Sequence, residues 1–598
     1  MTNVIAKFYC SPSLVLLAMD WPDGETRKDF LGFAIRRRPG FQDNITGVFA
    51  DKSWLPNRLG FNGPPPEGRP DPPSNKAPIQ KFLWWDARLD GLKPQSKLTY
   101  QISPICGTVL DFTLIQNDSI DVKVTIPSHV EFGIGTWFNR AVMSSQAFSR
   151  ILKALNINNN EKPSQKNSLK LRKWLANGME LPLADFILSS SSLIGAIYHL
   201  TDNLWVIPAF KTKMMATQNM MIGLVYDAKI KKDPETDKPL PNPNNAAIET
   251  LQNVQFFPRD KTSIMHNKFL VAGEDLLSEN DAKPKLLTCG SSNYTTDGLT
   301  SQANLIHTFT SSELAELYWE RFQLLKENPK KSSIARDAKW SHTITVGDAG
   351  IRIFFSPEPR TDGETFGVSI DTIVKEIHSA KSSVMFCLFT PTDERLRQAC
   401  FSAGDAGKMM FGLVNRINKT EPEINPSSSG HIPADQLAAL EIYHRSKDKK
   451  DVIGAEFFNA SAVPAGFQPE INIFPGTKPP PYPPVIIHHK FIVIDAETES
   501  PIIYTGSANM NGNSVFNNDE NLMEIKGSPR LAHIYLSEFL RLYEHYRARA
   551  RFIAFRRNRT RATAAEFGLA LRKDNSWAKK HYTPGTPEYK SRIRMIAI

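Results

Sequence analysis

VIIHHKFIVIDAETESPIIYTGSANMNGNSVFNNDEN, residues 485–521, is the most informative stretch of this sequence. It opens with an apolar, β-branched run that predicts a buried strand. His488 and Lys490 lie two residues apart in that run, so a strand places both side chains on one face and His489 on the other. An imidazole beside a fixed ammonium suits phosphate chemistry. The nitrogen can attack phosphorus or carry a proton, and the lysine neutralises the phosphate oxygens.

Further polar groups follow in the same stretch. Asp495 ends the first predicted strand, and a second apolar run, IIYTGSAN, supplies Ser507 and Asn509 as neutral donors to phosphate oxygens. Glu520 comes eleven residues after Asn509. A carboxylate there can hold an imidazole in one tautomer and stabilise its protonated form. The stretch therefore predicts a site for phosphate-ester chemistry.

These residues resemble the signature of the phospholipase D superfamily, of the bacterial type that carries two H-x-K motifs in one chain. That signature is H-x-K-x4-D, followed by G-S-x-N and then a glutamate. A lone H-x-K would most often be an incidental histidine in a buried strand, whereas the full series at this spacing is far more specific. The residues that match the signature are His488, Lys490, Asp495, Gly506, Ser507, Asn509 and Glu520.

The same pattern occurs 222 residues earlier in the chain. SIMHNKFLVAGEDLL contains His266 and Lys268 on one predicted strand face, and LLTCGSSNYTTDGLTSQANLI contains Gly290, Ser291 and Asn293. MMIGLV before the first motif recurs as MMFGLV before the second, and these core strands mark the register of the two copies. The chain is therefore predicted to contain an internal duplication.

The first copy departs from the signature at two positions. Gly273 stands at the aspartate position, with Glu274 and Asp275 just beyond, and Ala303 stands at the glutamate position when NLM and NLI are aligned. The aspartate is expected to support structure more than chemistry, because its offset of seven from the histidine places it on the opposite strand face. We predict an active but asymmetric site, with an inactive first repeat as the alternative.

The resemblance implies a mechanism in which both repeats face one phosphate. His266 would attack phosphorus and form a phosphohistidine, and His488 would protonate the leaving alcohol and then activate water or an acceptor alcohol. The scheme needs no metal and no cofactor, and the sequence shows no carboxylate cluster that would bind a metal. The candidate catalytic residues are His266, Lys268, His488, Lys490, Asp495 and Glu520. The candidate phosphate-binding residues are Ser291, Asn293, Ser507 and Asn509.

The rest of the chain is predicted to form several domains around this α/β core. Short, turn-separated strands over 1–128 predict a β-sandwich. Helical periodicity over 129–183, including WFNRAVMSSQAFSRILKAL, predicts a connector. The two phospholipase D-like repeats are expected at 184–345 and 346–528. A basic helical tail is expected at 529–598.

The tail carries most of the net charge. From position 541 to the end it has fifteen Lys or Arg and four Asp or Glu, so the rest of the chain is close to neutral. The basic residues alternate with the aromatic residues Phe567, Trp577, Tyr582 and Tyr589. This pattern suits contact with nucleic acid or with an anionic membrane surface. A basic helix face that only packs is the third interpretation.

Three proline-rich insertions flank the motifs, KKDPETDKPLPNPNNAA, TEPEINPSSSGHIP and GTKPPPYPPV. Proline-rich segments cannot continue a strand or a helix. We expect loops around the strand ends and predict that they select the substrate.

Composition limits the class and the compartment. At 598 residues, with 41% hydrophobic and 22% charged residues, the chain predicts a globular protein of about three or four domains. No run approaches the ~18–20 apolar residues that span a bilayer, and the N-terminus lacks the features of a signal peptide. The five cysteines show no pairing pattern, which favours a reducing compartment, by default the cytoplasm.

The leading functional interpretation is a phosphodiesterase that cleaves a phospholipid headgroup. A metal-independent endonuclease and a catalytically weak scaffold on the same fold are the alternatives.

Overall fold

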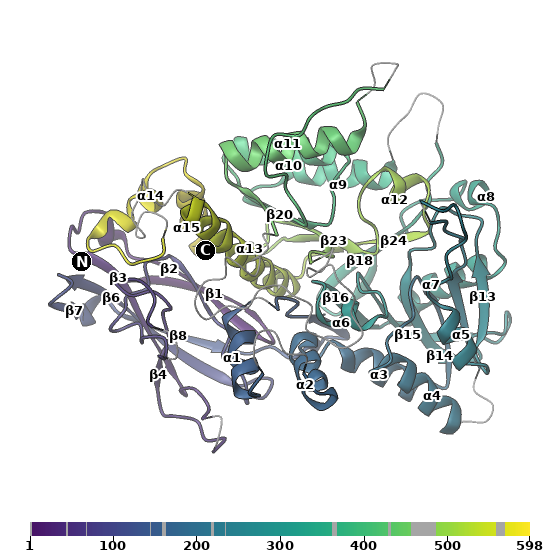
Figure 1. Ribbon diagram of the computed structural model, residues 1–598, viewed down its shortest axis with the longest axis horizontal. Coiled ribbons are helices and arrows are strands. Elements are labelled where there is room, and N and C mark those ends of the chain that lie inside the picture. Colours follow the sequence, from purple (N-terminus) through teal and green to yellow (C-terminus); the bar gives the residue numbers. More distant parts are fainter. Residues whose placement is uncertain are drawn as a thin grey trace.

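The computed structural model describes residues 3–43, 46–66, 69–143, 145–157, 163–216, 221–233, 235–360, 367–427, 432–455, 486–557 and 568–597. Two eight-stranded sheets dominate the molecule, and a smaller β-domain at the N-terminus packs beside them (Figure 1).

The first sheet has three parallel strands at one edge and antiparallel strands after them. Its spatial order is β13 (Gln255–Arg259), β12 (Ile222–Asp227), β11 (Ser192–Ile197), β14 (Lys268–Glu274), β15 (Lys283–Gly290), β16 (Leu305–Thr310), β10 (Ile134–Phe138) and β9 (Val130–Glu131).

The second sheet repeats this order strand for strand, with the same parallel and antiparallel pairs. Its spatial order is β21 (Val452–Gly454), β20 (Met409–Val414), β19 (Ser383–Leu388), β22 (Lys490–Ile494), β23 (Ile502–Gly506), β24 (Glu520–Lys526), β18 (Ala349–Ser356) and β17 (Ile344–Val346). The chain is therefore a structural duplication, in which β14 and β22 carry the two H-x-K lysines.

The helices of the two repeats correspond in the same way. The helices of the first repeat are α3 (Glu180–Ser189), α4 (Val206–Ala216), α5 (Asn245–Thr250), α6 (Thr296–Thr300) and α7 (Ser312–Lys326), followed by the short α8 (Lys331–Ala335). Their counterparts are α9 (Val368–Ser379), α10 (Glu394–Asp405), α11 (Ala434–Asp448), α12 (Gly512–Phe516) and the first half of α13 (Pro529–Arg557). One apolar core includes both sheets, Tyr318 and Phe322 of α7, and Tyr535 and Phe539 of α13.

The predicted helical connector at 129–183 needs a correction at its start. Ile134–Phe138 is a strand whose five residues are all buried, and it pairs with β16 of the first sheet. The helix predicted from Trp137 begins only at α1 (Gln146–Ala154), where Ser145 accepts a hydrogen bond from the amide of Phe148. Short apolar runs fit strand and helix equally well, and pairing with β16 settles the choice. After α1 the chain forms α2 (Gln165–Ala176) and α3.

The N-terminal domain contains two sheets that share one core. The first sheet orders β1 (Ile5–Ser11), β2 (Leu14–Asp20) and β5 (Leu83–Asp86). The second orders β4 (Ser53–Trp54), β3 (Phe30–Arg38), β6 (Lys97–Gly107) and β7 (Phe112–Leu114), with β8 (Ile120–Thr125) also on β6. Val15 and Leu17 of β2 pack with Phe33 and Ile35 of β3.

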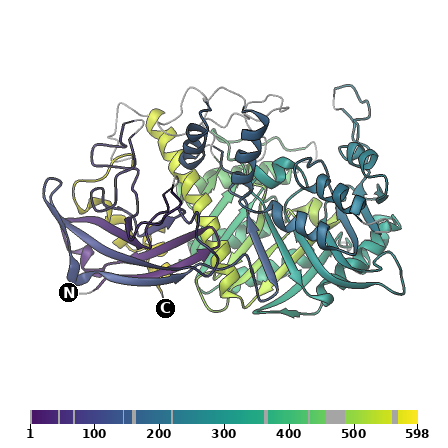
Figure 2. The ribbon, with the colours of Figure 1, turned by 90° about the horizontal axis from the view of Figure 1, so that it is seen from below.

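The predicted tail is part of the folded core, which corrects its description as a separate basic segment. Helix α13 is the counterpart of α7 and lies between the N-terminal strands and the two repeats (Figure 2). Beyond it, the Trp577 indole donates to the carbonyl of Phe30 at 3.0 Å, and the Tyr582 hydroxyl donates to that of Trp21 at 2.6 Å. Both aromatic side chains are buried in the N-terminal domain, so neither is available for base stacking. Phe567 lies outside the described residues.

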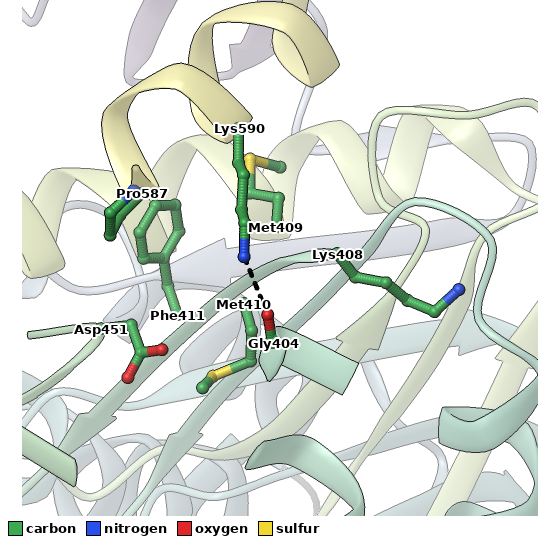
Figure 3. Close-up of a pocket in the computed structure, with 8 residues that line it drawn as sticks. All are labelled: Gly404, Lys408, Met409, Met410, Phe411, Asp451, Pro587 and Lys590. Atoms are coloured by element: carbon green, nitrogen blue, oxygen red, sulfur yellow. Dashed lines mark hydrogen bonds between the residues drawn. The ribbon is translucent and has the colours of Figure 1, made fainter. Parts of the chain in front are cut away.

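The last helix, α15 (Pro587–Ile596), connects the N-terminal domain to the second repeat. The Tyr9 hydroxyl donates to the Met595 carbonyl at 2.7 Å, and Met595 is buried. On the other side, the Lys590 ammonium donates to the Gly404 carbonyl at 2.8 Å, beside a small pocket (Figure 3).

The remaining sequence expectations concern the loops, the cysteines and the membrane. The insertion GTKPPPYPPV lies outside the described residues, and the other two insertions are described in part. The first of them continues directly into α5. All five cysteines are free. Among the helices that the structure describes, none combines the length and the apolar character needed to cross a bilayer.

Candidate active site

The two H-x-K segments meet at the boundary between the repeats, and each is held by the other repeat. Met265 forms a β-bridge with Asp519, and Ile487 forms the equivalent bridge with Ala303. The amide of His266 donates to the Asp519 carbonyl at 2.9 Å, and that of His488 donates to the Ala303 carbonyl at 3.1 Å. Main-chain hydrogen bonds across the boundary therefore fix the positions of both histidines.

Each imidazole contacts a side chain from the opposite repeat. His266 Nδ1 lies 3.2 Å from Glu520 Oε2. His488 Nδ1 lies 2.8 Å from Asn304 Oδ1. One histidine therefore faces a carboxylate and the other a neutral amide, so the site is asymmetric in charge.

The glutamate position of the first repeat is Asn304, which corrects the assignment of Ala303. The strand pairing is decisive, because Gly290 pairs with Ile306 where Gly506 pairs with Leu522. The sequence contained this signal, since Asn304 and Glu520 each lie fourteen residues after the glycine of their G-S-x-N motif. Alignment of the two Asn-Leu pairs shifted the register by one residue, which in a strand exchanges the two faces.

The two lysines are completely buried beside their histidines. The ammonium of Lys490 donates to the His488 carbonyl at 2.7 Å, and the ammonium of Lys268 donates to the His266 carbonyl. Burial lowers the pKa of Lys490 to about 7. Burial and the charge of Lys490 hold the pKa of Lys268 well below its ordinary value. A bound phosphate would stabilise both ammonium groups, because an adjacent opposite charge favours the ionised form.

Both histidines are neutral near pH 7 in the protein without ligand. Burial, together with the charge of Lys268, lowers the pKa of His266 from 6.5 to about 4. Burial and the two lysine charges hold the pKa of His488 well below its ordinary value. A neutral imidazole retains the lone pair that a nucleophile or a general base requires.

Glu520 is held ionised and oriented. Its Oε1 accepts hydrogen bonds from the Ser514 hydroxyl at 3.0 Å and from the Asn518 amide at 2.8 Å. Burial alone would raise the pKa of this carboxyl, but His266 and Asn518 outweigh burial and hold it below its usual range. The charged carboxylate can therefore stabilise positive charge that develops on His266.

Asp495 is not part of this cluster, which corrects its grouping with the catalytic residues. It follows the far end of β22, and its carboxylate accepts hydrogen bonds from the main-chain amides of Lys381, Ser382 and Ser383 at 2.7–3.1 Å. It fixes the loop before β19. This agrees with the expectation that the missing aspartate in the first repeat affects support more than chemistry.

The two serines of the G-S-x-N motifs bond within their own repeats. The Ser291 hydroxyl donates to Asn304 Oδ1 at 2.8 Å, and Ser507 Oγ accepts from the amide of Asn521 at 3.0 Å. Both serines are completely buried. We therefore assign them to positioning Asn304 and Asn521, in place of the predicted contact with phosphate.

Unlike the serines, the two asparagines of these motifs have side-chain atoms that are not used in hydrogen bonds among the described residues. Asn293 and Asn509 each have a buried side-chain oxygen without a hydrogen-bond partner among the described residues. The amide oxygen and nitrogen are interchangeable by a flip of the group. Their amides are therefore available to a substrate.

Several residues beside the histidines escaped the sequence analysis. The Tyr198 ring lies edge-on to His266 at 5.0 Å between centroids, and Lys268 Nζ lies 4.9 Å from the Tyr198 centroid. In the second repeat Phe389 takes the equivalent place, 6.4 Å from His488. Tyr198 directly follows β11, and Phe389 directly follows β19. This shared position in the sequence could have identified the two residues as a pair.

Asp227 and Asn415 form a second pair of equivalent residues. Asp227 Oδ1 accepts from the amide of Met265 at 3.0 Å, and Asn415 Oδ1 accepts from those of Ile486 and Ile487 at 2.9 and 3.0 Å. Both side chains hold the chain just before an H-x-K motif. Burial raises the pKa of Asp227 to about 6. Within the described part of the chain, no three His, Cys, Asp or Glu side chains gather as a metal site.

Comparison with known families gives one match. Residues 373–543, which include most of the second repeat, match the family described as "Cardiolipin synthase, PLD-like domain". No curated protein sequence matches this chain.

Solved structures resemble this one only distantly. Phosphatidylserine synthase from Haemophilus influenzae is 12% identical, with 66% of this chain and 90% of that chain covered and a TM-score of 0.41. Polyphosphate kinase from Porphyromonas gingivalis is 10% identical, with 82% and 71% covered and a TM-score of 0.35. Yeast tyrosyl-DNA phosphodiesterase is 11% identical, with 59% and 88% covered and a TM-score of 0.29. Similarities of this size carry no argument about function.

Both repeats carry the H-x-K and G-S-x-N motifs, and the family match covers most of the second repeat. Over residues 373–543 this protein is therefore similar to the phospholipase D-like domain family.

Proposed function

We propose that this protein is a phosphodiesterase that cleaves or transfers a phosphodiester through a phosphohistidine on His266. The observation that carries the proposal is the unequal pairing of the histidines, with Glu520 beside His266 and Asn304 beside His488. A nucleophilic imidazole gains positive charge as its bond to phosphorus forms, and a carboxylate at Nδ1 stabilises that charge. A neutral amide at His488 leaves its protonated form a stronger acid.

In the first step, His266 Nε2 attacks phosphorus while its Nδ1 remains directed at Glu520. The bond from nitrogen to phosphorus forms as the bond from phosphorus to the leaving oxygen breaks. His488, protonated in the complex with the anionic substrate, gives its Nε2 proton to that oxygen. Lys268 and Lys490, with Asn293 and Asn509, would neutralise and orient the phosphoryl oxygens.

In the second step, His488 accepts a proton from water or from an acceptor alcohol. The oxygen attacks phosphorus, the bond between phosphorus and His266 breaks, and the neutral imidazole of His266 is restored. His488 therefore acts as acid and then as base.

We take a phospholipid as the substrate, with cleavage at the headgroup. The description of the matching family, a cardiolipin synthase-like domain, supports a lipid phosphodiester. The case for nucleic acid rested on the basic tail, the cysteine usage and the missing signal peptide, and its stacking component is weaker because Trp577 and Tyr582 are buried. Nucleic-acid cleavage, and a scaffold without turnover, are the outcomes that would replace this proposal.

The test is to trap the covalent intermediate. Wild-type protein is incubated in EDTA with a phospholipid labelled at phosphorus, in neutral-detergent micelles, and quenched in alkali, which preserves phosphohistidine. We expect label on the wild-type protein, more label on His488→Ala because the second step is slowed, and none on His266→Ala. Label on His266→Ala but not on His488→Ala would reverse the two roles.

The matched control is His378→Ala, since His378 is an exposed histidine of α9. This variant should behave as wild type. Labelled single-stranded DNA is assayed in parallel. Cutting of DNA without release of phosphatidic acid would replace the lipid by nucleic acid, and no label with either substrate would favour the scaffold.

A further inference from the structure

Helix α2 presents a cationic face with one leucine to solvent. Lys166, Leu169, Lys170 and Lys173 follow at intervals of three, one and three residues, which places them on one side of a helix. All four are exposed, and Leu169 retains 38% of its accessible surface. The opposite side packs against α1 through Leu171 and Leu175, which are completely buried.

Helix α2 is fixed to α6, the short helix that follows the first G-S-x-N motif. Arg172 Nη1 contacts Asp297 Oδ1 at 2.7 Å and donates to Thr300 Oγ1 at 2.6 Å, and both partners lie in α6. Helix α6 begins three residues after Asn293. The face of α2 is therefore held next to the repeat that carries His266.

Two further exposed leucines lie in the segments that follow α2 in the chain. Leu181 is 55% exposed in the first turn of α3, which follows α2 after a short turn. Leu204 is 39% exposed just before α4, and its amide donates to Asp202, which also accepts from Thr296 of α6. The segment before α4 and helix α2 therefore both attach to the short helix α6. We call Lys166, Leu169, Lys170, Lys173, Leu181 and Leu204 the docking face.

The exposed charge of the segment that carries the docking face is mostly positive. Among the described residues from 145 to 216, the acidic side chains Glu180 and Asp202 are buried, and Asp185 is the exposed one. The exposed cations of the same segment are Arg150, Lys153, Lys166, Lys170, Lys173 and Lys211. In the second repeat, α9, the counterpart of α3, mixes Asp371 and Glu376 with Lys375.

The helices α1 and α2 are also an addition to the shared fold. The first repeat connects β10 to α3 through residues 139–179, whereas the second connects β18 to α9 through residues 357–367. The first repeat therefore carries a cationic helix that has no counterpart among the described residues of the second repeat (Figure 1).

We propose that the docking face binds an anionic phospholipid bilayer and holds the candidate site at the lipid surface. This inference rests on the proposed phospholipid function and names the surface that would serve it. Lysines near an anionic bilayer are attracted to its surface potential, and leucines between them can enter the boundary of the acyl chains. Nucleic acid would match the lysines but would give the exposed leucines no apolar partner.

The first test is vesicle sedimentation with the full-length protein. Vesicles of pure phosphatidylcholine are compared with vesicles in which a third of the lipid is phosphatidylglycerol. We expect binding only to the anionic vesicles. The variant Lys166→Glu/Lys170→Glu/Lys173→Glu should lower the partition coefficient by at least ~100-fold, because each lysine contributes a factor of roughly five at an anionic surface.

A matched charge reversal controls for net charge. Lys447, Lys449 and Lys450 are exposed at the end of α11, at the opposite edge of the molecule from α2 (Figure 1). Their triple change to glutamate alters the net charge equally and should leave vesicle binding near the wild-type value. Equal losses in both triple variants would overturn the proposal, since binding would then depend on net charge alone.

The leucines supply a second, independent test. Leu169→Ser/Leu181→Ser keeps every lysine, and we expect it to lose the part of vesicle binding that survives high salt. If this variant binds vesicles at high salt as well as the wild-type protein does, the leucines do not enter the bilayer, and that part of the proposal is wrong.

Two further measurements separate docking from catalysis and from nucleic-acid binding. Hydrolysis of bis(p-nitrophenyl) phosphate, which needs no bilayer, should be unchanged in all three variants and reports that they fold. The wild-type protein could bind vesicles through α2 and yet show no diesterase activity. That result would support docking and contradict the proposed function. If the α2 variant loses binding to labelled DNA but keeps vesicle binding, the docking face binds nucleic acid, and the membrane proposal is wrong.

Discussion

The two histidines of the candidate site are equivalent in fold but not in electrostatics. His266 faces the ionised Glu520, and His488 faces the neutral Asn304. A carboxylate favours the positively charged imidazole and an amide does so much less. At the residue scale, this single difference separates a candidate nucleophile from a candidate acid.

The pH dependence of kcat/KM should report His266. The pKa of its imidazole is lowered to about 4 by burial and by Lys268. Below that pH the nitrogen is protonated and cannot attack, so kcat/KM should fall about tenfold per pH unit on the acid side. The check is a pH–rate profile with a substrate that does not titrate in this range. An acid limb near the ordinary value of 6.5 would contradict the depressed pKa.

Lys490→Met should stabilise the protein while abolishing activity. Burial lowers the pKa of Lys490 from 10.5 to about 7. Below about pH 7 the buried Lys490 is charged in the folded state, which lowers the free energy of unfolding by the full cost of burying that charge. Between the two pKa values the unfolded lysine binds a proton that the folded one lacks, so stability rises with pH. Removing the amine should therefore raise the thermal midpoint by several degrees at pH 6, and by less at pH 9.

The control for this prediction is Lys375→Met, because Lys375 is exposed on α9. Its midpoint should not depend on the substitution at either pH. A lower midpoint for Lys490→Met at pH 6 would show that the ammonium stabilises the resting protein.

At the scale of elements, the starts of β16 and β24 connect the two repeats. Asp519 immediately precedes β24, and its main chain bonds to the amide of His266 and to the carbonyl of Ile264. Its carboxylate lies 2.8 Å from Arg259 Nε and 3.5 Å from Arg321 Nη2, both in the first repeat. A buried ion pair thus fixes the strand that delivers Glu520 to His266.

Asp519→Ala should destabilise the protein by about 3–5 kcal/mol, because it leaves the completely buried Arg259 without its charge partner. Activity should fall as well, since the adjacent Glu520 loses its anchor. Denaturant unfolding measures the first effect. Asp51→Ala is the control, because its pair with Arg38 is 65–68% exposed and should contribute less than ~1 kcal/mol. Equal effects of the two variants would contradict this account of the boundary.

At the scale of the whole molecule, the C-terminal segment returns to the N-terminal domain. Trp577 stacks on Phe82 at 5.4 Å between centroids and lies in the sandwich core with Tyr582. Lys590 of α15 reaches the second repeat. The segment after α13 therefore joins the N-terminal domain to the second repeat.

Trp577→Ala should lower the unfolding transition of the N-terminal domain by about 3–5 kcal/mol, through the lost contacts and the cavity left behind. Differential scanning calorimetry would resolve it. Affinity for labelled DNA should stay at the wild-type value, because the indole is buried. Lys573→Ala, at an exposed position nearby, serves as the control. Unchanged unfolding with reduced DNA affinity would restore the interpretation of the tail as a stacking surface.

The sequence was most informative where a short pattern specifies both geometry and chemistry. His266, Lys268, His488 and Lys490 were predicted from the two-residue spacing of a strand, although β14 and β22 begin only at the lysines, and the repeated motif predicted two copies. It was least informative at the edges of the repeats. Strand β10 and helix α13 were assigned to a connector and a tail, because periodicity does not say which sheet or core an element joins.

By itself, the sequence indicated the phospholipase D-like motifs, the duplication and the candidate catalytic pairs, because these depend on local spacing. Only the tertiary structure decided that Asn304 contacts His488, that Asp495 supports a loop, and that Trp577 belongs to the sandwich core. All three facts depend on contacts between segments far apart in the chain. Such contacts are set by strand register and packing across the whole molecule, which no local pattern records.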